Sequence, residues 1–245
     1  MTDSFTSPES IAAIPRRKTA STPIYMPEWL MLAPLALHIT EALESYARGT
    51  LLDLGCGARP YERLGRGVGR WIGFDVEGNP VADVHGKAES LPFEAGSIDT
   101  VLCSQVLEHV SDPRAVLGEC SRVLKEGGML VISAPQYWEM HEKPHDFFRY
   151  TLFGMRALLN TAGFEILQEW SECSGGAIAP LSLNLALGAI GKDLPYHRSL
   201  WFNALKAPFY LVSNLAGVIL QRLLPNSDDV ANYTLAARKR GTGGA

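Results

Sequence analysis

The sequence predicts an α/β fold with a mostly parallel sheet, and three observations indicate it. Residues 50–54 hold the leucines of a strand covered on both faces, and Gly55 and Gly57 follow at once. Strand and helix patterns then alternate along the chain, which is typical of parallel sheets. The next strand candidate ends in an acid, Asp75, twenty residues after Gly55.

These features predict a nucleoside site at the carboxyl ends of the strands. A glycine turn lets a ligand approach the main chain, and an acid about 20 residues on holds the ribose hydroxyls in doubly wound sheets. The pattern Gly-x-Gly followed by Arg59 is not the Gly-x-Gly-x-x-Gly of dinucleotide-binding proteins. The expected ligand is therefore a nucleoside that carries an amino acid, rather than a pyrophosphate.

The elements follow in a regular order. A helix is predicted over 27–46, with Pro34 bending it, ahead of the first strand. A second helix, capped by Asp112 and stopped by Gly127 and Gly128, and a third over 151–161 lie later in the chain. The strand candidates are 50–54, 70–76, 82–85, 98–104, 129–134, 165–172 and 233–238.

Composition bounds the class of protein. The 245 residues are 47% hydrophobic, which predicts one large domain or a domain with an appendage. A net charge of −4 gives no reason to expect a nucleic-acid partner. The four cysteines are far apart and form no Cys-x-x-Cys, so we expect reduced thiols, no structural zinc and a cytoplasmic location; they are Cys56, Cys103, Cys120 and Cys173.

An apolar segment over 175–225 departs from an ordinary fold of this kind, in which the last two strands join by a short hairpin. It holds about two helices of extra chain, and 200–224 reads as one long amphipathic helix. Its polar stripe is Asn203, Lys206, Tyr210, Ser213, Asn214, Gly217 and Gln221, and its apolar stripe is Trp201, Leu205, Phe209, Val212, Ala216, Ile219 and Leu223.

No run of about 20 apolar residues occurs in this segment, so it is not expected to span a bilayer. A lid over an apolar substrate, a helix at the inner membrane surface, the seam of a homodimer and extra packing on the sheet all stay open. We divide the chain into a mobile tail (1–25), a core (26–174), the insertion (175–225), the last strand (226–240) and a second tail (241–245).

The chain resembles the class I S-adenosylmethionine-dependent methyltransferases. The matching runs, in order over roughly 50–170, are LLDLGCGARPY (51–61), GFD (73–75), ESLPF (89–93), DTVLCSQVLEHV (99–110) and LKEGGMLVI (124–132). The resemblance implies a Rossmann-like seven-stranded sheet with helices on both faces. It also implies that 233–238 enters antiparallel beside 165–172, and that the cofactor is S-adenosyl-L-methionine.

The resemblance also assigns the cofactor-binding residues. The methionine end would lie on Asp53, Gly55 and Gly57, the ribose on Asp75, the adenine beside Ala88 and Glu89, and the sulfonium opposite Ser104 and Gln105. Relatives commonly have Asp before the Ala-Glu pair, where this chain has Lys87, so adenine recognition is expected to rest on main-chain groups.

Candidate catalytic groups crowd into 136–150, which follows the fifth strand at the cofactor edge. Methyl transfer needs a nucleophile held in line and a base when that nucleophile is a hydroxyl. We expect His145 or His141 as general base, Asp146 orienting an imidazole, and Arg149 or Tyr150 contacting substrate. In the alternative, Asp146 and Arg149 pair only to pin the loop.

A metal site is a second hypothesis at Glu108 and His109. Ubiquinone-type and small-RNA O-methyltransferases bind a divalent metal through Glu-x-x-Glu-His here, but the first acid is Gln105 in this chain. His141 or His145 would have to complete the site, and two ligands alone do not make one. No metal is therefore predicted, and the alternative role of Glu108 and His109 is local packing.

The predicted function is transfer of a methyl group to an oxygen, in preference to a nitrogen, of a bulky acceptor. The segment 144–151 resembles a motif of relatives tied to cell-envelope saccharide or lipid modification, which favours a lipid- or saccharide-linked acceptor. The alternative is a catalytically inactive nucleoside-binding partner or regulatory subunit.

Overall fold

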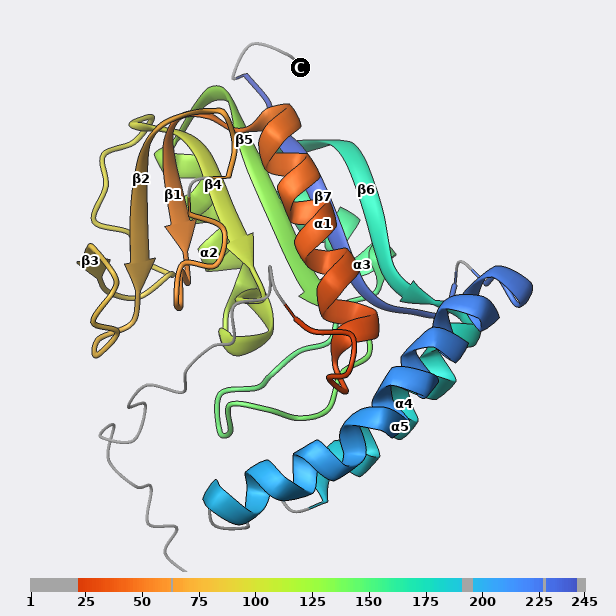
Figure 1. Ribbon diagram of the computed structural model, residues 1–245. Coiled ribbons are helices and arrows are strands. Elements are labelled where there is room, and N and C mark those ends of the chain that lie inside the picture. The colour runs from red at the N-terminus through yellow and green to blue at the C-terminus, as the bar shows by residue number, and fades with distance from the viewer. Residues whose placement is uncertain (1–21, 63, 191–195, 227, 242–245) are drawn as a thin grey trace, which may run out of the picture.

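A computed structural model describes residues 22–241 apart from 63, 191–195 and 227. The predicted tail over 1–25 falls mostly outside the described residues, as does most of 241–245. One seven-stranded sheet forms the centre of the molecule, in the order β3-β2-β1-β4-β5-β7-β6 (Figure 1). The strands are β1 (Arg48–Leu54), β2 (Gly67–Asp75), β3 (Val84–His85), β4 (Ile98–Ser104), β5 (Leu124–Pro135), β6 (Phe164–Ser174) and β7 (Val230–Lys239).

The predicted direction of the last strand is confirmed. β1 to β5 pair in parallel, whereas β7 runs antiparallel to both β5 and β6. β7 is inserted between the two, with Leu235 opposite Ile132 on β5 and Thr234 opposite Trp170 on β6. Because β1, β2, β4 and β5 are parallel, their carboxyl ends meet at one edge, where ligands bind in such sheets.

Helices cover both faces of the sheet. α2 (Pro113–Val123) and α3 (Leu152–Thr161) pack on one face, where alternate strand residues such as Leu52, Val101 and Ile132 join their apolar stripes. α1 (Trp29–Tyr46) packs on the other face with Leu51, Leu102 and Val131. The alternation of core sides along each strand explains the continuous apolar runs of the sequence.

One predicted boundary is wrong. Asp112 does cap α2, its Oδ1 accepting from the backbone N–H groups of Arg114 and Ala115 at 3.1 Å. The helix, however, ends at Val123, before Gly127 and Gly128, because Leu124 already pairs with Ile98 in the sheet. The two glycines lie inside β5 instead.

The apolar insertion forms two helices, as expected. η4 (Gly175–Ala177) leads into α4 (Ile178–Ala189), and α5 (Tyr196–Leu223) returns to β7. The two helices pack side by side along the carboxyl edge of the sheet (Figure 1). Within the described part of the chain, no helix combines the length and the hydropathy that crossing a bilayer requires.

Candidate active site

A glycine turn follows β1 at the carboxyl edge. Gly55 and Gly57 have φ of +70° and +52°, which favours glycine, and a Cβ on Gly55 would lie 2.5 Å from Val106 Cγ2. The backbone N–H groups of Gly55 and Cys56 both donate to the carbonyl of Phe74, at 2.8 and 3.0 Å. The turn is thus fixed to the end of β2, and Gly55 and Gly57 leave its main chain without Cβ atoms at those two positions.

Asp75 lies directly against this turn. Its Oδ2 accepts from the Gly57 N–H at 2.9 Å and from the Asn79 amide at 2.7 Å, and its Oδ1 accepts from the Val76 N–H at 2.8 Å. Asn79 also donates to the Gly57 carbonyl at 2.9 Å. The acid and the glycine turn, twenty residues apart in sequence, therefore form one hydrogen-bonded unit.

Cys56, between the two glycines of the turn, lies close enough to Asp53 and Asp75 to be affected by their charges. Burial, followed by the nearby charges of Asp53 and Asp75, raises the pKa of Cys56 to about 12. The thiol is therefore neutral and packs as a small apolar group, as the other three buried cysteines do. The two carboxylates make the surroundings of the turn locally negative, which suits a ligand that carries a sulfonium and an ammonium.

Arg59 stands two residues after Gly57, at the end of the glycine turn. Its φ of +52° is the conformation a glycine would adopt freely, and its guanidinium pairs with Asp83 and Glu62. The guanidinium lies so close over Gly73 that a Cβ there would come within 2.5 Å of it. An ion pair thus holds the turn in the shape that a glycine usually permits.

A polar chain begins at the ends of β4 and β5 and runs through the sheet. Ser104 Oγ lies 3.0 Å from Ser133 Oγ, and the Gln105 amide donates to Ser133 Oγ at 3.2 Å and to Asn232 Oδ1 at 2.8 Å. Asn232 in turn donates to Glu172 Oε2 at 2.8 Å. This chain fixes the side chain of Gln105, whose φ is +56°, above the sheet.

The predicted adenine contacts lie where β3 gives way to the next turn. Ala88 packs on the core, Glu89 is half-buried, and the exposed Lys87 accepts through its carbonyl from the Ser90 N–H at 3.0 Å. The residues of the turn, of Asp75 and of this segment fit the cofactor, because the bare main chain and the acid stand at the carboxyl ends of neighbouring strands.

The comparisons with known proteins address this part of the chain. A family model described as a methyltransferase domain matches residues 52–132, which run from β1 through the site to β5. Residues 52–132 are a class I S-adenosylmethionine-dependent methyltransferase domain. S-adenosylmethionine is accordingly its cofactor. That its methionine and ribose ends lie on the glycine turn and Asp75 stays a prediction.

Two curated relatives match the methyltransferase domain. A ubiquinone biosynthesis O-methyltransferase from Xanthomonas oryzae pv. oryzae is 34% identical over 119 residues, which are 42% of this chain and 49% of that protein. A probable S-adenosylmethionine-dependent methyltransferase from Mycolicibacterium smegmatis is 31% identical over 148 residues, 54% of this chain and 58% of the relative. The chain therefore spans about half the length of the curated relatives it matches.

Solved structures share the fold. The [4+2]-cyclase SpnF matches with a TM-score of 0.52 and 20% identity, over 86% of this chain and 83% of that one. At this identity the likeness concerns the fold alone, and the reaction has to be argued from the side chains of this methyltransferase domain.

The loop 136–150 closes over the same edge and is clamped to η3 (Leu107–His109), the turn after β4. The Phe147 N–H donates to the Glu108 carbonyl at 2.7 Å, and the Tyr150 hydroxyl donates to the Leu107 carbonyl at 2.8 Å. His109 Nδ1 lies 2.6 Å from the His145 carbonyl. The loop and η3 thus form one layer beside the cofactor turn. Val106, which precedes η3, packs against Gly55 of that turn.

Asp146 and Arg149 organise the loop from within. The Arg149 guanidinium donates to both carboxylate oxygens of Asp146, at 2.6 and 2.9 Å, and also reaches the carbonyls of Trp138 and Glu139. The hydrogen bonds from Arg149 hold the pKa of Asp146 well below its usual range. Asp146 and Arg149 therefore form the ion pair of the alternative interpretation, in which they only hold the loop in place.

Two imidazoles of the site face each other, and their hydrogen bonds set their tautomers. His109 Nδ1 is at 2.6 Å from the His145 carbonyl and His141 Nδ1 at 3.1 Å from the Glu139 carbonyl. A carbonyl can only accept, so Nδ1 carries the proton in each ring and Nε2 is the basic nitrogen when the ring is neutral. The rings stand edge to face with centroids 4.6 Å apart.

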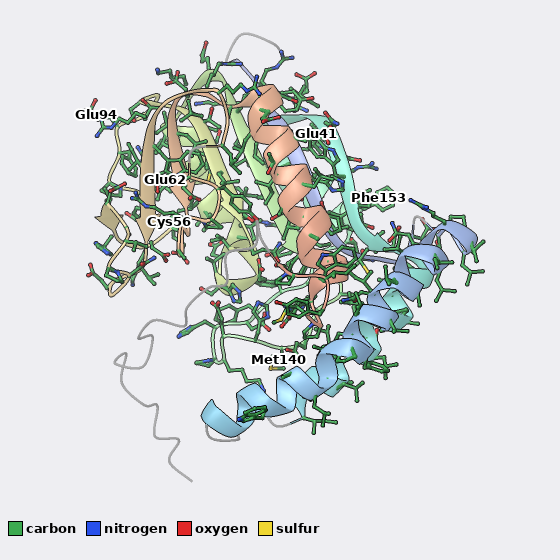
Figure 2. The ribbon with its side chains drawn as sticks, viewed as in Figure 1. Glu41, Cys56, Glu62, Glu94, Met140 and Phe153 are labelled. Atoms are coloured by element: carbon green, nitrogen blue, oxygen red, sulfur yellow. The ribbon has the colours of Figure 1, made fainter. Side chains whose placement is uncertain are left out.

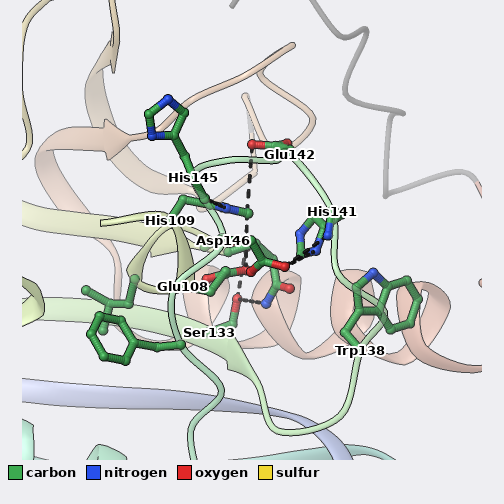
Figure 3. A network of polar contacts seen from close by, with 12 residues as sticks. Glu108, His109, Ser133, Trp138, His141, Glu142, His145 and Asp146 are labelled. Atoms are coloured by element: carbon green, nitrogen blue, oxygen red, sulfur yellow. Dashed lines mark hydrogen bonds and ion pairs between the residues drawn. The ribbon is translucent and has the colours of Figure 1, made fainter. Parts of the chain in front are cut away.

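Asp146 lies against His141 rather than against the ring of His145. Its Oδ2 accepts from the His141 backbone N–H at 2.9 Å and lies 3.5 Å from His141 Nδ1. Figure 3 shows the His145 ring pointing away from Asp146, toward the exposed side. Of the two predicted substrate contacts, Arg149 is half-buried in the loop, while Tyr150 is buried with its hydroxyl held by Leu107.

The structure also supplies the third group that the metal hypothesis needed. In the described part of the chain, ligand atoms of Glu108, His109 and His141 lie within 4.8 Å of one another. Glu142 Oε2 is 3.8 Å from His109 Nε2, while the His145 side chain is not part of this group. These three residues could hold a divalent cation.

Three polar residues of the site escaped the sequence analysis. Asn79 joins Asp75 to the glycine turn, and Ser133 and Asn232 hold Gln105. The contacts with Gly57 and Gln105 join residues far apart in sequence. A signal existed for Asn232, since an amide inside the otherwise apolar run of a central strand has to find a buried partner.

Proposed function

We propose that this chain transfers a methyl group from S-adenosylmethionine to an oxygen of a bulky, lipid- or saccharide-linked acceptor. The sulfonium supplies an electrophilic methyl carbon when the cofactor is bound. The residues of the chain then have to hold the acceptor hydroxyl in line and take up its proton.

The observation that carries the proposal is the pair of imidazoles at the cofactor edge. Each presents Nε2 as its basic nitrogen, and His141 is oriented through Asp146. His141 is therefore the proposed general base, and Arg149, locked by Asp146, keeps the loop in place. The oxygen acceptor is supported by the O-methyltransferase among the curated relatives.

Activity of the wild-type protein and of His141→Ala tests the proposal. The probe is methyl-labelled S-adenosylmethionine, offered with an extract of cell-envelope lipids and saccharides. We expect labelled product from the wild-type protein and a fall of about 10²- to 10⁴-fold in turnover for the variant, the usual contribution of a general base. Calorimetry should find cofactor affinity unchanged, since His141 lies outside the glycine turn.

His145→Ala is the matched control, because this histidine lies in the same loop but points away from Asp146. Its turnover should stay near that of the wild-type protein. An equal loss in both variants would contradict the assignment of the base. Cofactor binding without any labelled product would favour the alternative, a nucleoside-binding partner or regulatory subunit.

A further inference from the structure

The long helix α5 turns its polar side chains toward the protein. Lys206 Nζ donates to the carbonyls of Leu187 and Ile190 at the end of α4, at 2.8 and 2.7 Å. The Asn214 amide donates to the carbonyls of Ile24 and Met26, at 2.5 and 2.9 Å, and its Oδ1 accepts from Asn184 at 2.7 Å. Two residues of the polar stripe noted in the sequence, Lys206 and Asn214, are thus held by contacts inside the fold.

The opposite face of α5 is apolar and exposed. Five side chains along it are more than half exposed: Trp201 (81%), Leu205 (78%), Val212 (67%), Ile219 (57%) and Leu223 (69%). Their intervals of four and seven residues keep them on one side of the helix over about 33 Å of its length. This is the reverse of a helix that packs its apolar stripe on a core, and so large a continuous apolar stripe indicates an interaction surface.

Net charge distinguishes between two possible partners of this apolar stripe, a second copy of the chain and a lipid surface. Residues 175–225, which form the helical hairpin of α4 and α5, contain four basic residues and one acid, Asp193, and so have a net charge of +3. The rest of the chain has a net charge of −7, which gives the total of −4. The basic residues are Lys192, Arg198, Lys206 and Arg222. Pairing two such hairpins through α5 would bring like charges together, whereas an anionic lipid surface complements them.

We propose that α5 lies in the interface of an anionic lipid bilayer, with the stripe Trp201, Leu205, Val212, Ile219 and Leu223 among the headgroups and upper acyl chains. An exposed apolar stripe with aromatic and leucine side chains on a positively charged hairpin is the signature of such a helix. No bilayer crossing is involved.

The position of the hairpin relates this surface to the candidate site. Trp138 of the loop 136–150 packs in the same apolar cluster as Leu181 and Leu185 of α4. In the view of Figure 2, the exposed Met140 of that loop lies at the edge of the loop nearer to α4 and α5. Docking of α5 on a bilayer would therefore bring the loop 136–150 toward the lipid. The further step, that the acceptor is lipid-linked, rests on the proposed function.

Vesicle flotation with the full chain tests the surface. The probes are vesicles of phosphatidylcholine alone and of phosphatidylcholine with phosphatidylglycerol. We expect the protein to float with the mixed vesicles, more weakly at high salt, and to stay largely unbound with the neutral ones. Protein that stays out of the lipid fraction with both vesicles would overturn the proposal.

The paired variant Leu205→Gln with Ile219→Gln should lower the partition coefficient at least about tenfold. The matched control is Leu37→Gln with Phe153→Gln, two similarly exposed apolar residues on α1 and α3.

An equal loss in the control pair, or a stable dimer in light scattering that Leu205→Gln dissociates, would contradict the assignment. Circular dichroism checks folding, and cofactor affinity measured on the same samples separates this proposal from the proposed function.

Discussion

Asp146 illustrates how one buried carboxylate shapes the loop over the site. It holds the Arg149 guanidinium with both oxygens and the His141 main chain with one of them. Because these hydrogen bonds favour the charged form, the pKa of Asp146 is lowered, and its pairing stabilises the fold.

The sign of the pH dependence follows from this direction. A carboxylate whose folded pKa is depressed contributes its full stabilisation above the pKa of the unfolded chain, about 4. The contribution is lost as the pH falls from there through the lower folded value. The Asp146–Arg149 pair should therefore weaken only in strongly acid solution.

Asp146→Asn should lower the free energy of unfolding by about 1–3 kcal/mol at neutral pH, the range for hydrogen bonds to charged groups. The difference from the wild-type protein should shrink as the pH falls below about 4. Urea unfolding followed by circular dichroism at several pH values measures it. Asp228→Asn, at an exposed carboxylate, is the control, and a difference that is constant with pH would contradict the role given to Asp146.

At the scale of single residues, the sequence predicted a glycine turn and an acid beside it, but not the contacts within the loop 136–150. The positions of Gly55, Gly57 and Asp75 were predicted, since a strand, a turn and an acid follow a local pattern. The choice between His141 and His145 was not, because both belong to one loop and only folding decides which faces Asp146.

At the scale of elements, β7 connects the site to α1. Asn232 on β7 accepts from Gln105 and donates to Glu172 on β6, whose other oxygen lies 2.8 Å from His38 Nδ1 on α1. Glu172 and Asn232 are both fully buried. This chain of contacts replaces the solvent that these groups lost on folding.

Glu172→Ala should lower the free energy of unfolding by about 1–3 kcal/mol, because the buried amide of Asn232 loses its acceptor. Urea unfolding measures it. Glu165→Ala on the same strand removes only an exposed contact with Arg238 and should change stability little. Equal effects of the two substitutions would show that the buried hydrogen bonds of Glu172 stabilise the fold no more than an exposed ion pair does.

Most elements were predictable because their apolar periodicity is local. β4 was predicted to the residue. β7 was predicted as a strand from its own residues, but its direction and its partner required the family resemblance, since nothing in its sequence says which strands it joins. The end of α2 was misplaced because pairing of Leu124 with Ile98, a long-range contact, ends the helix before the glycines. The two stripes of 200–224 were predicted, but not that Lys206 and Asn214 of the polar stripe face the protein.

At the scale of the whole molecule, the loop after β5 and the turn after β4 act as one layer beside the cofactor turn. Glu108, His109 and His141 meet where these two segments join. The same groups suit proton transfer and cation binding, so the two roles need separate tests.

Dialysis against a chelator should leave turnover unchanged, because a sulfonium is already a strong electrophile and needs no Lewis acid. The measurement is product formation before and after dialysis, with Mg²⁺, Mn²⁺ or Zn²⁺ added back. Loss of activity that an added cation restores would instead assign Glu108, His109 and His141 to a metal site.

The central claim is that the glycine turn and Asp75 hold S-adenosylmethionine. Calorimetric titration of the full chain with the cofactor tests it most directly. We expect saturable binding that Asp75→Ala weakens by about 1–3 kcal/mol, the scale of lost hydrogen bonds to a carboxylate. Glu77→Ala, two residues away and exposed, should bind as the wild-type protein does. No heat of binding from folded wild-type protein, or equal affinities for both variants, would contradict the account.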